Sequence, residues 1–443
     1  MKKYVGQIIG IICVIVLFLG IRRGLNYILT DDTKSLTRIM MHQLYNPEDN
    51  IDVLFVGSSH VYRSLIPEIT DEAFQAYTFN AGSSNQAMDG SLAIIKEAII
   101  YNDVKKIYLE TYYDIANMEE PEDRTQMTGT YIIADYMRPS WRKIAYLFQA
   151  SSKKHYSNSF IIARRNWEKI FDLNYINELL DKKNEKSYKE YEWVKTNGDI
   201  EYYVDRGFVA NDGFMSSEEQ WNAAAYGNIA AVNNISKESN WRKNLQRIID
   251  LCEDEGIELT LFVAPMPEWT IVGKENYDEY SQMVRTIAKE NNIGYYDFNL
   301  CKSIYFDADD RMLFKDADHL NTQGAERFSQ LFGEFSSGMI KESELFYDSL
   351  ETKIQEKTAK VYGMGGPYMK NIENVLYAKI VSNRPNEMEY RIVMHPKEKE
   401  AYVIQNFDLN AEVSFPKDEH GIIEISWRLS TDKQISGILE VAY

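Results

Sequence analysis

Residues 51–60 read Ile-Asp-Val-Leu-Phe-Val-Gly-Ser-Ser-His, and the interpretation of the whole chain starts from them. The run rich in Val and Ile that ends at Gly57 is typical of a strand buried on both faces of a parallel sheet. Gly57 indicates a tight turn directly after that strand, with Ser58 and Ser59 on it. Ligands of open α/β sheets bind outside the carboxyl ends of the strands. This stretch therefore predicts an α/β domain whose first strand presents a serine to a crevice.

The alternation of strand and helix continues along the chain on both sides of a long interruption. Apolar runs predict further strands, and stripes with helical spacing predict helices between them. The expected strands cover 77–82, 105–114, 257–267 and 293–299, and the expected helices cover 91–102, 240–256, 280–292 and 322–335. Strands that alternate with helices in this way imply right-handed parallel crossovers. The sequence therefore predicts a five-stranded parallel sheet with packed helices.

The amino terminus predicts one membrane helix. An apolar run over 4–21 lies between Lys2-Lys3 on one side and Arg22-Arg23 on the other. Its roughly 18 residues reach about 27 Å as a helix, which is enough to cross a bilayer core. No small-residue cleavage site follows, so the run favours an uncleaved anchor over a signal peptide. A slight excess of positive charge before the run puts the amino terminus inside the cell. The expected protein is therefore a single-pass protein of the cell membrane with an extracytoplasmic body.

Two further segments depart from the α/β pattern. Residues 115–239 contain many Tyr, Trp, Lys and Glu residues and few strand-like runs, which predicts a mainly helical insertion. Such an insertion serves either as plain packing or as a lid or substrate platform over the site. From about residue 353 the apolar runs are short and separated by turn residues, which predicts a small β-sandwich. The expected domains are an anchor at 1–28, an α/β domain at 29–345 that includes the insertion, and a β domain at 350–443.

Composition argues against several classes of function. The chain has 443 residues, with 49 Lys and Arg against 67 Asp and Glu, and a formal net charge of −18. Such an acidic surface repels phosphate backbones, so nucleic acid is not expected as a partner. The three cysteines form no Cys-x-x-Cys pair and no cluster with histidine, so no metal site is predicted.

Three separated pieces carry the expected chemistry. Ser59 follows the first strand, Gly82 ends the second, and the Asp-Ala-Asp-His run at 316–319 precedes the last helix. His319 is placed to take the proton of Ser59 while an aspartate orients the imidazole, as a serine nucleophile requires. Asp316 is the favoured partner of His319, and Asp318 is the alternative. The backbone N–H groups of Ser59 and Gly82 are candidates for an oxyanion hole.

Together these pieces resemble the SGNH (GDSL-like) hydrolase superfamily, whose fold is a flavodoxin-like three-layer α/β structure. In that family a G-D-S-type motif follows strand one, an oxyanion glycine follows strand two, and a D-x-x-H motif lies near the end of the domain. Gly57-Ser58-Ser59, Gly82 and Asp316-x-x-His319 occupy these positions. The resemblance covers about 52–110 and 240–340.

The chain departs from the family pattern at two places. Ser58 stands where the family has Asp, and the third family block, G-x-N-D, has no counterpart after the third strand. The asparagine that the resemblance implies for the oxyanion hole is therefore open. Asn85 is our candidate, with Asn80 and Thr111 as alternatives. His60, next to the nucleophile in sequence, is expected to be a pocket or packing residue rather than the base.

The serine motif, the membrane helix and the Asp-x-x-His-Leu-Asn ending look most like extracytoplasmic SGNH proteins that modify envelope polymers. Examples are the teichoic-acid D-alanyl-transfer protein and the alginate and peptidoglycan O-acetylation proteins. The resemblance implies O-acyl transfer to an envelope glycan or polyol-phosphate polymer through an acyl-Ser59 intermediate. It also implies a multi-spanning membrane-bound O-acyltransferase as partner, and no cofactor.

Two other hypotheses remain open from the sequence. One is a carbohydrate esterase of the same fold, in which water resolves the acyl-enzyme. The other is a catalytically idle surface protein that binds glycan or assists assembly, which the missing third block keeps open. The presence of Ser59, Asp316 and His319 together argues against an idle core, because packing alone does not require all three.

Overall fold

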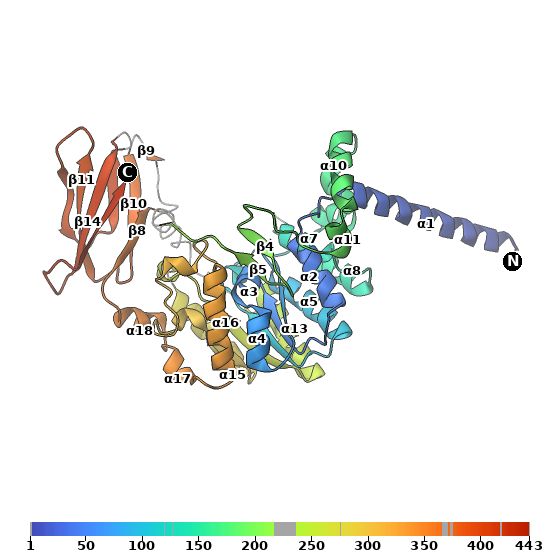
Figure 1. Ribbon diagram of the computed structural model, residues 1–443, viewed down its shortest axis with the longest axis horizontal. Helices are drawn as coiled ribbons and strands as arrows, with labels where there is room; N and C mark the ends of the chain where they lie inside the picture. The colour runs from blue at the N-terminus through green and yellow to red at the C-terminus, as the bar shows by residue number, and fades with distance from the viewer. Residues whose placement is uncertain are drawn as a thin grey trace.

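The structure, a computed structural model, describes residues 2–118, 120–125, 127–216, 236–274, 276–365, 371–372, 375–416 and 419–442. Three parts follow one another along its longest axis (Figure 1). Helix α1 (Lys2–Leu29) projects from one end, an α/β body occupies the middle, and a β domain lies at the other end.

Five parallel strands form the sheet at the centre of the body. They lie in the order β2-β1-β3-β6-β7, which is the flavodoxin-like order. Their bounds are β1 Val53–Gly57, β2 Thr78–Gly82, β3 Lys106–Glu110, β6 Glu258–Val263 and β7 Gly294–Asp297. Each neighbouring pair is parallel, and Gly57 lies directly opposite Gly82. The predicted five-stranded parallel sheet is therefore confirmed.

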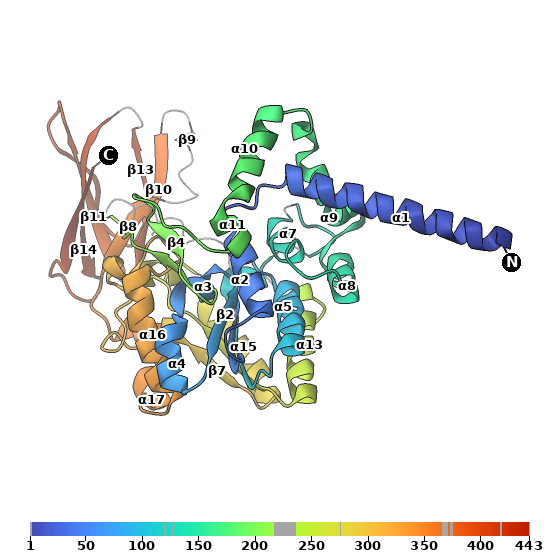
Figure 2. The same cartoon turned by 45° about the vertical axis from the view of Figure 1, so that its right-hand side comes forward.

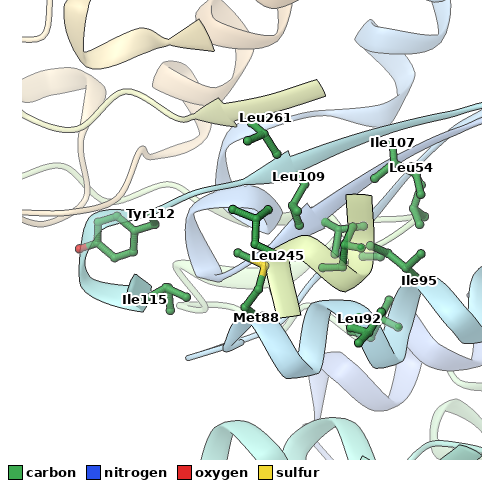
Figure 3. Close-up of a cluster of buried hydrophobic side chains, with 14 of the residues drawn as sticks. Leu54, Met88, Leu92, Ile95, Ile107, Leu109, Tyr112, Ile115, Leu245 and Leu261 are labelled. Carbon is green, nitrogen blue, oxygen red and sulfur yellow. The ribbon is translucent and has the colours of Figure 1, made fainter. Parts of the chain in front are cut away.

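Helices cover both faces of this sheet and make three layers. One face carries α5 (Met88–Tyr101), α13 (Asn240–Glu255) and α15 (Tyr277–Glu290). The other carries α3 (Ser59–Ser64), α4 (Pro67–Phe74) and α16 (Thr322–Ser336). Figure 3 shows the first of these interfaces, where Leu54, Leu109 and Leu261 of the strands meet Leu92 and Ile95 of α5. Each such buried side chain contributes about 1.5–3 kcal/mol, so this packing fixes the strand ends that carry the site.

Three strands end earlier than the sequence predicts. The strand expected over 293–299 ends at Asp297, and the 3₁₀ helix η3 (Phe298–Leu300) follows it directly. The strand expected over 105–114 ends at Glu110, and α6 (Tyr113–Ala116) follows because the backbone turns to bury the ring of its first residue in the core. The strand expected over 257–267 ends at Val263, because two prolines follow it and neither has an N–H to donate to a ladder.

Between β3 and α13 the described residues form short helices and one hairpin. The main helices are α7 (Thr128–Ala134), α8 (Trp141–Ala150), α9 (Tyr156–Phe160), the 3₁₀ helix η2 (Ile162–Lys169), α10 (Leu173–Asn184) and α11 (Lys186–Glu190). The hairpin pairs β4 (Glu201–Tyr203) with β5 (Val209–Asn211). The described part of the predicted insertion is thus mainly helical, and residues 217–235 of it lie outside the described residues.

Helix α1 is exposed over most of its length. Residues Gln7–Leu29 have a mean hydropathy of 2.3, and none of the apolar window is buried in the protein. This helix is long and apolar enough to span a membrane. Its last turn is fixed to the insertion, because the ammonium group of Lys183 donates to the carbonyls of Tyr27 at 2.8 Å and Thr30 at 2.6 Å. A helix end leaves such carbonyls without partners, so Lys183 holds α1 to the body through defined bonds.

The carboxyl-terminal residues form two antiparallel sheets around one core, as the sequence predicts. One sheet has the order β13-β10-β8 with β9 beside β10, and the other has the order β12-β11-β14-β15. The strands are β8 Val361–Gly365, β9 Asn371–Ile372, β10 Val375–Ser382, β11 Met388–Pro396, β12 Tyr402–Asp408, β13 Glu412–Pro416, β14 Gly421–Leu429 and β15 Gly437–Ala442. Met364 and Ile380 of the first sheet share a buried cluster with Ile392 and Ile425 of the second.

A buried carboxylate lies where the β domain meets the body. Glu268, in α14 (Glu268–Ile271), accepts a hydrogen bond from the hydroxyl of Tyr362 at 2.8 Å and another from Lys357. The charges of Lys353 and Lys357 outweigh the effect of burial and keep the pKa of Glu268 below its usual range. The junction therefore has a paired, ionised carboxylate at its centre.

Candidate active site

The serine turn lies where β1 passes into α3. Ser58 is the N-cap residue of α3, and its hydroxyl accepts a hydrogen bond from the N–H of His60 at 3.2 Å. Ser59 is the first residue of the helix, so its own N–H has no acceptor within the helix. Only glycine fits at position 57, because a Cβ there would lie 2.5 Å from the Cβ of Glu110. The local sequence thus sets the half-buried Ser59 at the carboxyl end of β1.

Ser59, His319 and Asp316 form one hydrogen-bonded chain. Oγ of Ser59 lies 2.7 Å from Nε2 of His319. Nδ1 of His319 lies 2.9 Å from Oδ1 and 3.1 Å from Oδ2 of Asp316. With the proton of the neutral ring on Nδ1, facing the carboxylate, Nε2 is the acceptor for the serine proton. The structure brings together the three residues that the sequence predicts as catalytic, although they lie 260 positions apart along the chain.

The loop before α16 is built around Asp316. Its Oδ1 accepts the backbone N–H of Asp318 at 2.9 Å and that of His319 at 2.8 Å, while Oδ2 lies 2.8 Å from the ammonium group of Lys315. Burial acts to raise the pKa of Asp316, but the bonds from His319 and Lys315 outweigh it and hold the pKa well below its usual range. Asp316 is therefore ionised, and it rather than Asp318 holds the imidazole.

A second acid–base pair lies buried beneath the serine turn. Glu110, at the end of β3, accepts the N–H of Ser58 on Oε2 at 2.6 Å. Nδ1 of His60 lies 3.1 Å from the hydroxyl of Ser58 and 3.7 Å from Oε1 of Glu110. Burial raises the pKa of Glu110 to about 7, against the opposing effect of its bonds to Ser58. Burial and the neighbouring His319 lower the pKa of His60 well below its usual value. His60 is therefore neutral at physiological pH.

His60 also packs against the face of the imidazole of His319. The two rings stack with centroids 4.6 Å apart and planes at 15°, and Tyr112 contacts His60 with centroids 4.0 Å apart. His319 is thus held at its edge by Asp316 and at its face by His60. The packing role expected for His60 agrees with this contact.

Gly82 lies against the serine turn. A Cβ on Gly82 would lie 2.7 Å from the carbonyl oxygen of Ser58 and 3.0 Å from the backbone nitrogen of Tyr62, so only glycine permits this approach. The structure therefore places Gly82 beside the turn that carries Ser59. Its contribution to an oxyanion hole stays a prediction.

The three candidates for the side-chain donor of the oxyanion hole differ in what they contact. Asn80 is fully buried, and its Nδ2 donates to two carbonyls at the end of α3, at 3.0 and 2.7 Å. The hydroxyl of Thr111 donates to a carbonyl of β6 at 3.3 Å. Asn85 is exposed with φ of 52°, and no described hydrogen bond joins it to Ser59. Asn80 and Thr111 are thus committed to holding the scaffold, and the role of Asn85 stays a prediction.

Glu110 is the residue of this site that the sequence prediction missed. It stands where the resemblance would place the third block, and the expectations from the sequence give it no role. A carboxylate at the end of an apolar strand, next to the strand that carries the serine, is the signal that points to it. Among the described residues no cluster of His, Cys, Asp and Glu is suited to a metal ion, and the expectation of a cofactor-free site stays a prediction.

Comparisons with known proteins find only remote structural similarity to this chain. No family model and no curated protein sequence matches the chain. Among solved structures, one provisionally described as a platelet activating factor from Streptococcus pneumoniae is 12% identical, with a TM-score of 0.31, and covers 69% of this chain and 94% of its own. A second, provisionally described as an acylhydrolase from Bacteroides fragilis, is 10% identical, with a TM-score of 0.29. The match covers 68% of this chain and 95% of the second structure.

Proposed function

We propose that this chain is an SGNH-type serine enzyme that transfers an acyl group through an acyl-Ser59 intermediate to a polymer of the cell envelope. The observation that carries the proposal is the chain of hydrogen bonds from Ser59 through His319 to Asp316. A serine hydroxyl with an unperturbed pKa is a poor nucleophile, and an oriented imidazole activates it by taking its proton.

The proposed reaction has two balanced half-reactions. Oγ of Ser59 attacks the carbonyl carbon of an acyl donor as Nε2 of His319 takes the hydroxyl proton. The bond from the carbonyl carbon to the leaving oxygen or sulfur then breaks, and His319 returns that proton to the leaving group. In the second half, a hydroxyl of the acceptor gives its proton to His319 and attacks the acyl carbon, and the Ser59 ester bond breaks as Ser59 recovers a proton. Asp316 stabilises the imidazolium in both halves.

The choice of an envelope polymer as acceptor rests on α1. With α1 in a membrane and the body on the outer side, Ser59 faces acceptors that are held at the cell surface. The proposed acceptor is the hydroxyl of a glycan or polyol-phosphate polymer, and a multi-spanning O-acyltransferase is the proposed source of the acyl group. The esterase hypothesis uses the same first half-reaction, with water as the acceptor in the second.

A serine-directed fluorophosphonate probe tests the nucleophile. We expect the full-length protein in detergent to be labelled at Ser59 and Ser59→Ala to remain unlabelled. Ser337→Ala is the control, because it removes an exposed serine hydroxyl at the end of α16 and leaves the serine turn unchanged; it should still be labelled. A wild-type protein that resists the probe would contradict an activated serine.

A deletion strain separates transfer from hydrolysis. We expect the strain to lose O-acyl groups from one envelope polymer, as measured by mass spectrometry, and to regain them with the wild-type gene but not with Ser59→Ala. A gain of O-acyl groups on deletion would instead support the esterase. Full rescue by Ser59→Ala would contradict both enzymatic hypotheses and favour a binding protein.

A further inference from the structure

A cleft of about 1070 Å³ opens where α1 meets the insertion. Its walls come from the end of α1, from α2 (Leu36–Tyr45), from the segment between α7 and α8, and from α10 and α11. Figure 2 shows α2, α10 and α11 gathered around the end of α1 that enters the body. We call this feature the juxtamembrane cleft; its basic lining residues are Arg23, Arg38, Arg138, Lys183 and Lys189.

The juxtamembrane cleft is basic although the chain is acidic. Five basic side chains line it against two carboxylates, Asp32 and Asp135, whereas the whole chain carries a formal charge of −18. Burial, and then the positive charges of Arg38 and Arg138, lower the pKa of His42 on the same wall. An anionic bilayer surface repels an acidic body, so the cleft is the place where an anion is electrostatically favoured.

Two of the five basic side chains are already paired. The ammonium group of Lys183 lies 2.9 Å from a carboxylate oxygen of Asp32, and the guanidinium of Arg38 lies 3.7 Å from the other. Within the described ranges, the remaining three, Arg23, Arg138 and Lys189, make no ion pair with a carboxylate. The guanidinium of Arg138 lies over the rings of Tyr45 and Tyr101 and donates to Oδ1 of Asn46 at 3.4 Å. Guanidinium and ammonium groups bind phosphate oxygens through charge-assisted hydrogen bonds, so Arg23 and Lys189 suit a phosphate, with Arg138 adding to the positive charge beside them.

The insertion that forms part of the cleft also carries exposed aromatic side chains. Trp141 on α8 is 78% exposed and Phe171 before α10 is 91% exposed, and Phe148 and Trp167 are also exposed. Aromatic residues collect at the interface between membrane and water, where such exposure is favourable. Trp167 lies on η2, which contacts α1 directly. Arg23, at the end of the apolar run, lines the cleft itself, so with α1 in a bilayer the cleft lies near the level of the lipid headgroups.

We propose that the juxtamembrane cleft binds the phosphate of an anionic lipid headgroup when α1 spans the bilayer. The cleft is larger than a lone phosphate needs and is in the range of pockets that enclose whole small molecules, so it accommodates the glycerol part of a headgroup as well. A bound headgroup would fix how the body is oriented on the membrane surface. This proposal does not involve Ser59, and it holds or fails independently of acyl transfer.

The test uses the full-length protein in a neutral detergent, with bound lipid counted by native mass spectrometry. Phosphatidylglycerol is the anionic lipid, phosphatidylcholine the zwitterionic comparison, and inorganic phosphate and glycerol 1-phosphate the soluble competitors. The test variant is Arg23→Gln with Lys189→Gln, and the matched control is Arg22→Gln with Lys182→Gln. All four side chains are exposed. The control removes the same charge from α1 and from α10, the helix directly before α11, without changing the lining of the cleft.

We expect the wild type to bind phosphatidylglycerol at least tenfold more tightly than phosphatidylcholine. The test variant should bind phosphatidylglycerol about thirtyfold more weakly, since each basic residue beside an anionic surface is worth about 1 kcal/mol and 1.4 kcal/mol is tenfold in affinity. The control should bind as the wild type does. Equal losses in the two variants would overturn the cleft as the site, and equal binding of the two lipids would overturn the anionic headgroup. Displacement of phosphatidylglycerol by millimolar inorganic phosphate would overturn the lipid as the source of the phosphate.

Discussion

The buried carboxyl group of Glu110 is expected to make the stability of this protein depend on pH, and Glu110→Gln should remove that dependence. Glu110 accepts the N–H of Ser58 at 2.6 Å and is only 4% exposed. A glutamine keeps an acceptor oxygen for this N–H and carries no charge at any pH. The substitution therefore removes the ionisation of the buried group while it keeps the bond that supports the serine turn.

The size and sign of the effect follow from the raised pKa. Burial raises the pKa of Glu110 from 4.5 to about 7, so the folded state holds the proton more tightly than the unfolded state. Stability is then highest below about pH 4.5, falls as the pH rises toward 7, and is level above that. One pKa unit is worth about 1.4 kcal/mol, so the wild type should lose about 3 kcal/mol of unfolding free energy across this range through Glu110.

The assay is guanidinium unfolding of the full-length protein in detergent, followed by tryptophan fluorescence from pH 4.5 to pH 8. The free energy of unfolding of Glu110→Gln minus that of the wild type should grow by about 3 kcal/mol between the two ends of the range. Glu326→Gln, on the exposed side of α16, is the control and should show no such growth. A difference for Glu110→Gln that stays constant with pH would refute the protonated carboxyl, whatever the absolute stability of the variant.

Three further predictions concern the site and its supports. Asp316→Asn should slow fluorophosphonate labelling on the order of 10⁴-fold, because the imidazole loses its orienting charge. Asp318→Asn should be labelled at a rate within tenfold of the wild-type rate. Equal losses of labelling rate in the two variants would contradict the assignment of Asp316. Gly207→Ala should destabilise the protein by more than about 2 kcal/mol in thermal unfolding, because φ is 83° and a Cβ would lie 1.6 Å from a carbonyl oxygen of β2. The control is Gly198→Ala, which has φ of 97° and open space around it and should cost about 1 kcal/mol. Equal losses of stability in the two variants would refute the clash at position 207. Lys183→Met should expose residues 30–35 to limited proteolysis, because the end of α1 loses two of its hydrogen bonds to the insertion. Unchanged cleavage relative to the wild type would contradict the proposed junction.

The sheet and the three catalytic candidates were predictable because each depends on local pattern. Apolar runs ended by glycine marked the strands, and the parallel sheet then required Ser59 and Gly82 to lie at the same edge. Asp316 and His319 are three positions apart, so a single loop sets their contact. The choice of Asp316 over Asp318 was left open by the sequence, because it depends on which carboxylate the loop turns toward the ring.

Glu110 was missed for a physical reason. Its importance comes from the lateral order of the strands, since β3 lies beside β1 and brings the carboxyl group under Ser58. The position of a strand along the chain is easier to predict from sequence than which strands lie beside it in the sheet. The same limit affects Asn85, which was chosen from its position after β2, while φ of 52° and the exposure of its side chain follow from a turn that the sequence did not specify.

The path from α1 to Ser59 is short. Residues 30–35 join α1 to α2 and reach about 20 Å at most when extended, and α2 is buried against the sheet through Met40 and Leu44. Lys34 at the end of this linker lines a small cavity of about 140 Å³ together with Gly82. The edge of the crevice that carries Gly82 therefore adjoins the segment that leaves α1. With α1 in a bilayer, Ser59 cannot travel far from the membrane surface, so under the proposed function both the acyl donor and the acceptor hydroxyl must be delivered to that surface.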